Sequence, residues 1–344
     1  MILGIDFGHY SIKIVVINNK EIYSVGEKTI INNLSGFDPD KLEVSHWQSA
    51  FKELCDELNI NIKKVDKIIS SISGSKVSIK PLTMLEMEES ELIEILNFEA
   101  KKHVPLDGSD PVVDYHILGQ NPKEIDKLDM LLVATTQKII KNHNLIIKSC
   151  SLKHPVFDTD PIALLNCYQY NYECIDNHVD VLLNIGLLNT TILVYGDNQE
   201  LLTREISIGG HQINLDIMKL KGSDYSEAEN SKKVEGVSIF ESDNDSESNS
   251  IQISQRNVLS DLSDEIRKTL RYYMKSKTGL SYNKFYISGG SSSMPGVVDF
   301  LNSNLNVEFE QLNPFNKLEM KDSIDNASKY AVSFGLAIRE MDKD

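Results

Sequence analysis

Basic residues and long apolar runs are scarce in this sequence. Its 35 lysines and arginines stand against 51 aspartates and glutamates, a formal net charge of −16. Nucleic-acid binding requires a basic face for the phosphate backbone, so we expect no nucleic-acid partner. No apolar run approaches the ~20 residues of a membrane-spanning helix. No basic region precedes the apolar start, which Asp6 interrupts, so no export signal is expected. We expect a soluble, cytoplasmic protein.

Cysteine is also scarce, and its spacing excludes two kinds of site. The chain has four cysteines, with no CxxC pair and no histidines at metal-ligand spacing: Cys55, Cys150, Cys167 and Cys174. Such a pattern favours reduced thiols in or near the core over disulfides or a zinc site.

A repeated order of elements is the main organisational signal. The chain has 344 residues, enough for two core-bearing lobes, since single cores stop growing at about 250–300 residues. Residues 1–30 follow the order strand, glycine turn, strand, polar turn, strand, and residues 179–210 repeat it. The repeat predicts two lobes of like fold around a cleft.

The remaining patterns predict an α/β fold with an inserted subdomain of order βαββα. Residues 241–254 are poor in apolar side chains, so we expect a disordered loop there. The predicted divisions are 1–73 for the first-lobe core, 74–155 for the inserted subdomain, 156–176 for the rest of the first lobe with an inter-lobe helix, 177–325 for the second lobe, and 326–344 for a closing helix.

Three glycine-rich turns each follow an apolar strand, around Gly8, Gly186 and Gly289–Gly290. Glycine lets backbone N–H groups converge on an anion. One such turn is usually only a tight turn, but three in this order suggest hairpins from opposite lobes that grip a phosphate chain. Asp6 would then hold Mg²⁺, directly or through water, with a strand-end cap of the Gly8 turn as the alternative.

Other polar residues near these turns carry two interpretations each. Lys13 either reaches a phosphate or points outward from its strand. Glu229 and Lys232 lie three residues apart on a helix face and either clasp a ribose or base or form a surface ion pair. His9 is either a catalytic base or a turn residue that lines the cleft mouth, and the second is favoured because no triad partner accompanies it.

Four stretches resemble the motifs of the actin-like ATPase superfamily: "LGIDFGHYSIKIV", "NIGLLNTTI", "REISIGGHQI" and "YISGGSSSMPG". They look like its first phosphate, second phosphate, inter-lobe and adenosine motifs. "FEAKKHVPL", "YHILG", "LLVATTQK", "DTDPIALLN" and "YSEAENSKK" resemble the PilM family of type IV pilus machines within that superfamily. The resemblance covers nearly the whole chain.

This resemblance implies a two-lobed actin-like (ribonuclease H-like) fold that binds ATP or ADP with Mg²⁺. The implied nucleotide contacts are Asp6 (also the metal ligand), Gly8, His9, Tyr10, Ser11, Lys13, Asn184, Gly186, Asn189, Thr190, Gly209, Gly210, Glu229, Lys232, Gly289, Gly290 and Ser291.

The resemblance also implies a scaffold role beside the inner membrane. PilM-like proteins bind the cytoplasmic N-terminal peptide of a PilN-like inner-membrane protein, and pilus motor and platform components are further implied partners. Membrane contact would be indirect. The groove would lie near the inserted subdomain, whose helix carries Leu92, Ile95, Leu96 and Phe98, with core packing as the alternative for most of these side chains.

Two departures from the family pattern bear on activity. Asn184 stands where the second phosphate motif usually has aspartate, and an amide neither acts as a base nor supplies a charge. Leu187 places bulk where a small residue usually admits phosphate. We therefore expect nucleotide binding with weak or absent hydrolysis and no catalytic residue. An active ATPase or sugar-kinase-like phosphotransferase, and a filament former like FtsA, are the alternatives.

Overall fold

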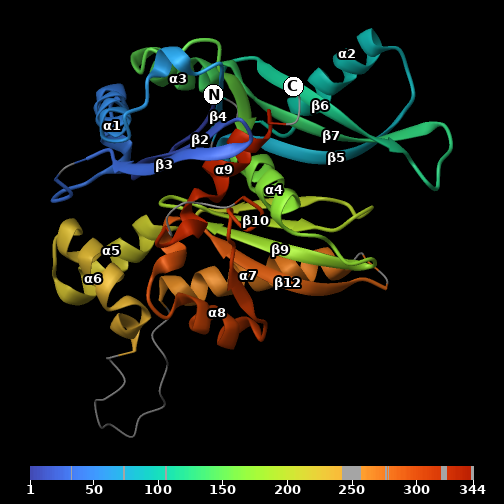
Figure 1. Ribbon diagram of the computed structural model, residues 1–344. Coiled ribbons are helices and arrows are strands. Elements are labelled where there is room, and N and C mark those ends of the chain that lie inside the picture. Colours follow the sequence, from blue (N-terminus) through green and yellow to red (C-terminus); the bar gives the residue numbers. More distant parts are fainter. Residues whose placement is uncertain are drawn as a thin grey trace, which may run out of the picture.

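The computed structural model describes residues 1–341 with the exception of 32, 73, 105–106, 242–256, 276, 278 and 319–323. Two lobes lie one above the other in Figure 1, each built around a five-stranded sheet. The loop expected to be disordered, 241–254, lies outside the described residues apart from Glu241. In the described part of the chain, no helix has both the length and the apolar character needed to cross a membrane.

The two sheets share one strand order, which confirms the repeat expected from the sequence. The first lobe has the order β3-β2-β1-β4-β8: β1 (Ile2–Phe7), β2 (Ser11–Asn18), β3 (Glu21–Thr29), β4 (Lys67–Ile72) and β8 (Val156–Thr159). The second has β11-β10-β9-β12-β13: β9 (His178–Ile185), β10 (Thr190–Tyr195), β11 (Leu202–Ile206), β12 (Ser281–Ser288) and β13 (Phe309–Gln311). In each lobe the first three strands pair antiparallel and the last two join in parallel. Each lobe therefore presents a β-hairpin at the same place.

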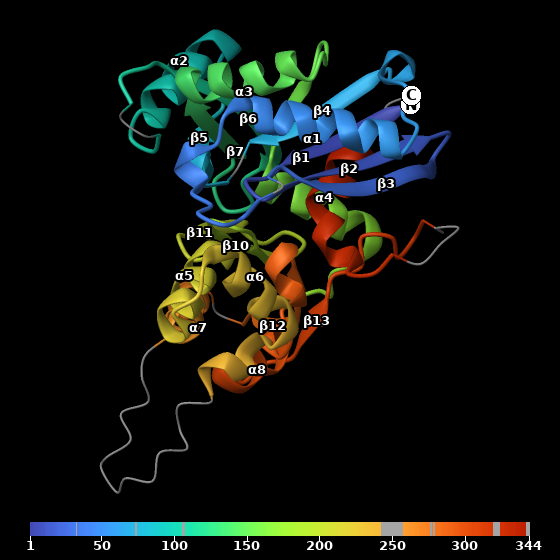
Figure 2. The same ribbon diagram turned by 90° about the vertical axis from the view of Figure 1, so that its left-hand side faces the viewer.

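Helices form layers on both faces of each sheet. The first sheet packs on one face against α1 (Val44–Glu57) and α3 (Gln137–Ser149). Its other face shares a core with the second sheet and with α4 (Asp160–Asn171) and α9 (Ala331–Ile338). Figures 1 and 2 show α4 and α9 between the two sheets. The outer face of the second sheet packs against α5 (Gly210–Lys221), α6 (Tyr225–Val234), α7 (Val258–Lys275) and α8 (Val297–Leu305).

The two central helices, α4 and α9, approach each other so closely that no side chain fits between them at Gly335. Gly335 of α9 lies on the backbone of α4, where an added Cβ would be only 1.7 Å from the Ala163 carbonyl oxygen. Gly4 of β1 meets the other side of α9, and a Cβ there would be 2.2 Å from the Ser333 carbonyl oxygen. The two glycines fix how closely sheet and helices approach at the junction of the lobes.

The predicted block 74–155 has the expected order but divides between two cores. β5 (Ser78–Leu85), β6 (Pro111–Gln120) and β7 (Lys127–Thr136) form a three-stranded sheet covered by α2 (Glu89–Ala100). Leu92 and Leu96 of α2 are buried in this small core, whereas Phe98 is 66% exposed. The end of α3 instead contributes Ile147 and Cys150 to the first-lobe core. Only the sheet and α2 therefore form a separate unit.

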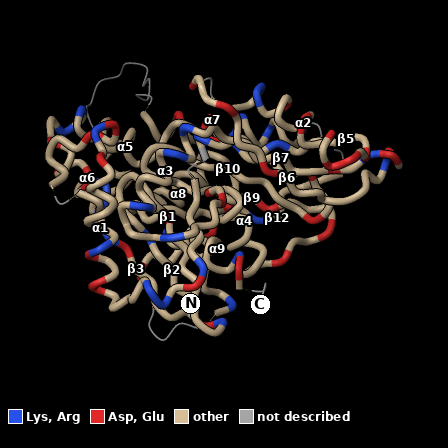
Figure 3. The backbone as a smooth tube through the Cα atoms, turned by 90° about the horizontal axis from the view of Figure 1, so that it is seen from above, with Lys and Arg blue, Asp and Glu red and all other residues tan. Residues whose placement is uncertain are grey.

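The ends of some elements differ from their predicted positions. The closing helix expected over 326–344 is a 3₁₀ helix, Ala327–Tyr330, followed by α9. The inter-lobe helix, predicted to begin at Phe157, begins only at Asp160, because Val156–Thr159 form β8, a strand of four residues whose pattern is too short to recognise. Cys55, Cys150, Cys167 and Cys174 are all free thiols, as expected, and the first three are buried. Figure 3 shows Lys and Arg positions interspersed with Asp and Glu positions along the chain.

Candidate functional site

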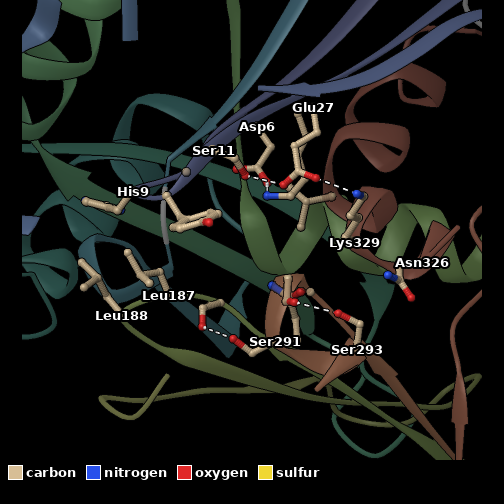
Figure 4. A pocket seen from close by; sticks show the side chains of 18 of the residues that line it. Asp6, His9, Ser11, Glu27, Leu187, Leu188, Ser291, Ser293, Asn326 and Lys329 are labelled. Carbon is tan, nitrogen blue, oxygen red and sulfur yellow. Dashed lines mark hydrogen bonds and ion pairs between the residues drawn. The ribbon is translucent and has the colours of Figure 1, made fainter. Parts of the chain in front are cut away.

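A cavity of about 780 Å³ lies between the lobes, where the predicted glycine turns meet (Figure 4). Its volume falls in the range of small-molecule and cofactor sites. All but three of the predicted nucleotide contacts line it: Asp6, Gly8, His9, Tyr10, Ser11, Lys13, Asn184, Gly186, Asn189, Glu229, Lys232, Gly289, Gly290 and Ser291. The three others, Thr190, Gly209 and Gly210, are not among its lining residues.

The first turn joins β1 to β2 and is held from outside by α1. The Trp47 indole Nε1 donates a hydrogen bond of 2.9 Å to the Gly8 carbonyl oxygen. His9 stacks edge-on against the same indole, with 6.3 Å between ring centroids. Burial, aided by Lys76, lowers the pKa of His9 to about 4. His9 is therefore neutral at pH 7 and supplies no positive charge for phosphate.

A row of charged side chains crosses the first sheet beside this turn. Asp6 pairs with Lys13 across β1 and β2, and Lys13 pairs with Glu27 across β2 and β3. The Lys13 Nζ lies 3.6 Å from the Asp6 Oδ2, and the lysine is 8% exposed. The outward orientation considered for Lys13 is therefore wrong, because it lines the cavity between two carboxylates.

A second carboxylate faces Asp6 from α4. Asp160 is the first residue of that helix, after the Thr159 cap, and lines the cavity. Burial raises the pKa of Asp6, and burial together with the Asp6 charge raises that of Asp160 well above its usual value. The Asp6 charge thus opposes ionisation of Asp160, and a cation beside both carboxylates would favour their ionised forms.

The second turn joins β9 to β10. The Gly186 N–H donates to the Asn189 carbonyl oxygen at 2.9 Å and closes the hairpin. Leu187 and Leu188 line the cavity, on the opposite side from Asp6 in Figure 4. Thr190 is fully buried and donates its Oγ1 to the Ile208 carbonyl oxygen at 2.7 Å. Its hydroxyl is bonded to the link between β11 and α5, and the side chain is not exposed to a ligand.

Gly209 and Gly210 were predicted to contact nucleotide, and the structure uses them differently. They begin α5, whose first N–H groups are already bonded. The Gly210 N–H donates to the Gly186 carbonyl oxygen at 2.9 Å and the His211 N–H to that of Leu187 at 2.8 Å. The Gly209 N–H donates to the Gln212 Oε1 at 3.0 Å. This helix start supports the second turn and is closed to phosphate.

The third turn follows β12 and touches the second. Gly289 has a φ of +93°, and a Cβ there would lie 2.5 Å from the Ile185 carbonyl oxygen, so only glycine fits. The Asn184 Oδ1 accepts from the Ser288 Oγ at 3.2 Å. Ser291 points to the Gly186 carbonyl oxygen at 3.5 Å. Asn184 is thus a tie between β9 and β12 as well as a cavity residue.

Glu229 and Lys232 of α6 are a buried pair, so their interpretation as a surface ion pair is wrong. Both are 5% exposed, and the Lys232 Nζ lies 2.5 Å from the Glu229 Oε2. Asn214 donates its Nδ2 to the same oxygen at 2.7 Å, and Lys233 lies 3.1 Å from the Glu229 Oε1. Burial favours the neutral form of Glu229, but Lys232, Asn214 and Lys233 outweigh burial and lower the pKa of Glu229. The pair presents fixed polar atoms to the cavity.

Contacts across the outer edge of the cleft join the lobes. The Lys233 Nζ donates to the Tyr10 hydroxyl at 2.9 Å, and the Ser35 Oγ to the Asp224 Oδ2 at 3.0 Å. Phe37 is 8% exposed and packs on Tyr225, with 5.0 Å between ring centroids. In Figure 1 this segment between β3 and α1 reaches down to α5 and α6. The cleft is therefore closed along this edge.

Sequence reasoning missed seven charged residues that line the cavity: Glu27, Lys28, Glu57, Asp160, Glu205, Lys233 and Lys329. Burial raises the pKa of Glu205 to about 7, although Thr191 donates a hydroxyl to it at 2.7 Å. Within the described residues, no three His, Cys, Asp or Glu side chains are grouped closely enough to hold a metal ion. Asp6 and Asp160 offer carboxylates of the kind Mg²⁺ accepts when phosphates and water complete its shell.

Comparison with known proteins places the chain in a family. The profile described as "Type IV pilus assembly protein PilM" matches residues 4–341. The chain belongs to the PilM family.

Solved structures agree on the fold. A "PilM-PilN type IV pilus biogenesis complex" superposes with a TM-score of 0.79 at 21% identity, covering 98% of both chains. The ethanolamine utilization protein EutJ from Carboxydothermus hydrogenoformans superposes with a TM-score of 0.54 at 13% identity, covering 98% of this chain and 89% of the other. The predicted actin-like fold is confirmed. This PilM-family chain is a type IV pilus assembly protein with that fold.

Proposed function

We propose that the chain binds an adenine nucleotide, ATP or ADP, with Mg²⁺ in the inter-lobe cavity and acts as a cytoplasmic scaffold of a type IV pilus or related secretion or competence machine. One observation carries the nucleotide proposal. Three glycine turns from the two lobes meet around a single cavity of about 780 Å³, with Asp6 and Lys13 at the first turn.

Each wall of the cavity supplies a different kind of contact. Asp6 and Asp160 would hold the metal, which when bound neutralises phosphate charge. Lys13 and the N–H groups of the first turn would meet phosphate oxygens. The buried Glu229–Lys232 pair would meet the ribose or base, because its atoms are held by Asn214 and Lys233.

Thermal unfolding with and without Mg-ATP tests this proposal. A ligand that binds only the folded state stabilises it by about 2.7 kcal/mol at a hundredfold excess over Kd. Asp6→Ala should abolish the shift, whereas Glu308→Gln, an exposed site on the second lobe, should keep it. A wild-type protein that shows no shift at millimolar Mg-ATP would contradict nucleotide binding.

We further propose that the partner is a PilN-like inner-membrane protein, bound through its cytoplasmic N-terminal peptide. The similarity to a solved PilM-PilN complex supports this choice. The chain would then be peripheral to the inner membrane through this partner and would link it to motor and platform components. The separate unit formed by α2 and the sheet of β5, β6 and β7 exposes apolar side chains suited to a peptide: Leu85, Ile93, Phe98, Ile117 and Leu118. Leu92 and Leu96 are buried in the core of this unit, so we no longer assign them to the predicted groove.

Titration calorimetry with a synthetic copy of the partner's N-terminal peptide tests this surface. Phe98→Ala should weaken binding by at least tenfold if Phe98 is an anchor. Tyr272→Ala, an equally exposed aromatic site on α7 in the other lobe, is the matched control. Equal affinity for wild type and Phe98→Ala would place the peptide elsewhere.

Slow ATP hydrolysis is a second candidate function, and Asp160 favours it. Its carboxyl group lines the cavity, and a cation beside it would favour the ionised form, which can act as a base. Asp160→Asn should then lose any turnover and weaken Mg²⁺ binding, while the nucleotide itself is still bound through Lys13 and the glycine turns. Turnover that survives this change would exclude Asp160 as the base.

A further inference from the structure

Glu27 has no role in the proposed nucleotide contacts, yet it lies among them. It lines the cavity on β3, next to Lys13 in the cross-strand row. The negative charge of a carboxylate repels phosphate on the wall that phosphate would contact. Its position therefore requires a separate explanation.

The Glu27 carboxylate uses both of its oxygens on groups that phosphate would use. The Ser11 Oγ donates to its Oε1 at 2.6 Å, and the Lys329 Nζ lies 2.6 Å from its Oε2. Figure 4 shows the carboxylate between Ser11 and Lys329 on the cavity wall. One acidic side chain thus engages a hydroxyl from the first turn and a cation from the C-terminal segment.

The same carboxylate is ionised at neutral pH. Burial opposes its charge, but Lys13, Lys329 and Ser11 outweigh burial and lower the pKa of Glu27. Glu27 and Lys329 are each only 24% exposed at the side chain, so bulk water and salt screen their charges weakly.

We propose that Glu27 is a specificity-determining residue, a built-in anion that competes with nucleotide phosphate for Ser11, Lys13 and Lys329. This inference rests on the proposed nucleotide function. ATP carries one more negative charge than ADP, so Glu27 opposes ATP more strongly. The cavity of the wild-type chain is therefore biased toward ADP, and nucleotide binding has to displace the Glu27–Lys329 contact.

Titration calorimetry of the full chain with Mg-ATP, Mg-ADP and adenosine tests the inference. Glu27→Gln keeps the size of the side chain and its contact with Ser11 while it removes the charge. It should tighten Mg-ATP binding by about tenfold, the effect of one nearby charge at a partly buried site. Mg-ADP should gain less, and adenosine should be unchanged. Glu27→Asp keeps the charge and should keep the wild-type ratio of ATP to ADP affinity.

Glu21→Gln is the matched control, because it removes one charge from an exposed position at the start of the same strand, outside the cavity lining. It should leave all three affinities unchanged. If wild type binds nucleotide and Glu27→Gln binds Mg-ATP no more tightly than wild type does, this inference is overturned and the proposed function stands. Glu27 would then serve to position Lys329. Absence of nucleotide binding by both proteins overturns the proposed function, and this inference with it.

Discussion

Glu205 makes the stability of the second lobe depend on pH. It lies on β11 beside the cavity, where burial raises its pKa from 4.5 to about 7. Below pH 4.5 the carboxyl is protonated in both the folded and the unfolded chain. Between 4.5 and 7 the unfolded chain loses its proton first, so the folded chain binds more protons and stability falls as pH rises. Above about 7 the loss is complete.

The size of this loss follows from the pKa shift. Each unit is worth about 1.4 kcal/mol, so ionisation of Glu205 costs the folded state about 3 kcal/mol at most. Glu205→Gln removes the charge and keeps an oxygen that accepts from Thr191. The variant should match wild type near pH 4.5 and exceed its free energy of unfolding by up to about 3 kcal/mol at pH 8.

Urea unfolding at both pH values, followed by circular dichroism, measures the difference. Fluorescence is less suitable, because Trp47 is the single tryptophan and lies in the other lobe. Glu308→Gln, at an exposed site, should show no pH-dependent gain. The reasoning fails if Glu205→Gln is no more stable than wild type at pH 8, or if its gain is the same at both pH values.

Two other substitutions test the activity and the junction of the lobes. Asn184→Asp should leave ATP turnover far below the ~10 s⁻¹ of a median enzyme, because the bulk of Leu187, which lines the cavity, would still hinder the approach of phosphate. Robust partner-free turnover by wild type, measured as phosphate release, would instead support an enzyme. Gly335→Ala should destabilise the chain by about 3 kcal/mol or more, because its Cβ would meet the Ala163 carbonyl oxygen; a wild-type urea midpoint would show that α4 and α9 separate easily.

Much of the fold was predictable because its signals are local. The first three strands of each lobe are apolar runs broken by a glycine turn and a polar turn, which the chain repeats. β8 and β13 are four and three residues long and pair only through the sheet, so no local pattern marks them. The allocation of α3 to the first-lobe core depends on contacts distant in sequence, such as that of Ile147.

The site divides in the same way. Its glycine turns were predictable, because each follows a strand. Gly209 and Gly210 have the composition of a phosphate loop, and only the fold shows that the second turn takes the N–H groups of this helix start. A carboxylate on a strand, like Glu27 or Glu205, resembles a solvent-facing residue until the cross-strand register places it in the cavity.

Equilibrium dialysis of the full chain against radiolabelled ATP with Mg²⁺ tests the central claim most directly. We predict saturable retention of one ATP per chain by wild type, displacement by unlabelled ADP, and loss of retention in Asp6→Ala. The cavity would then be a nucleotide site that depends on the carboxylate of the first turn. Retention by wild type no greater than by Asp6→Ala at millimolar ATP would contradict it.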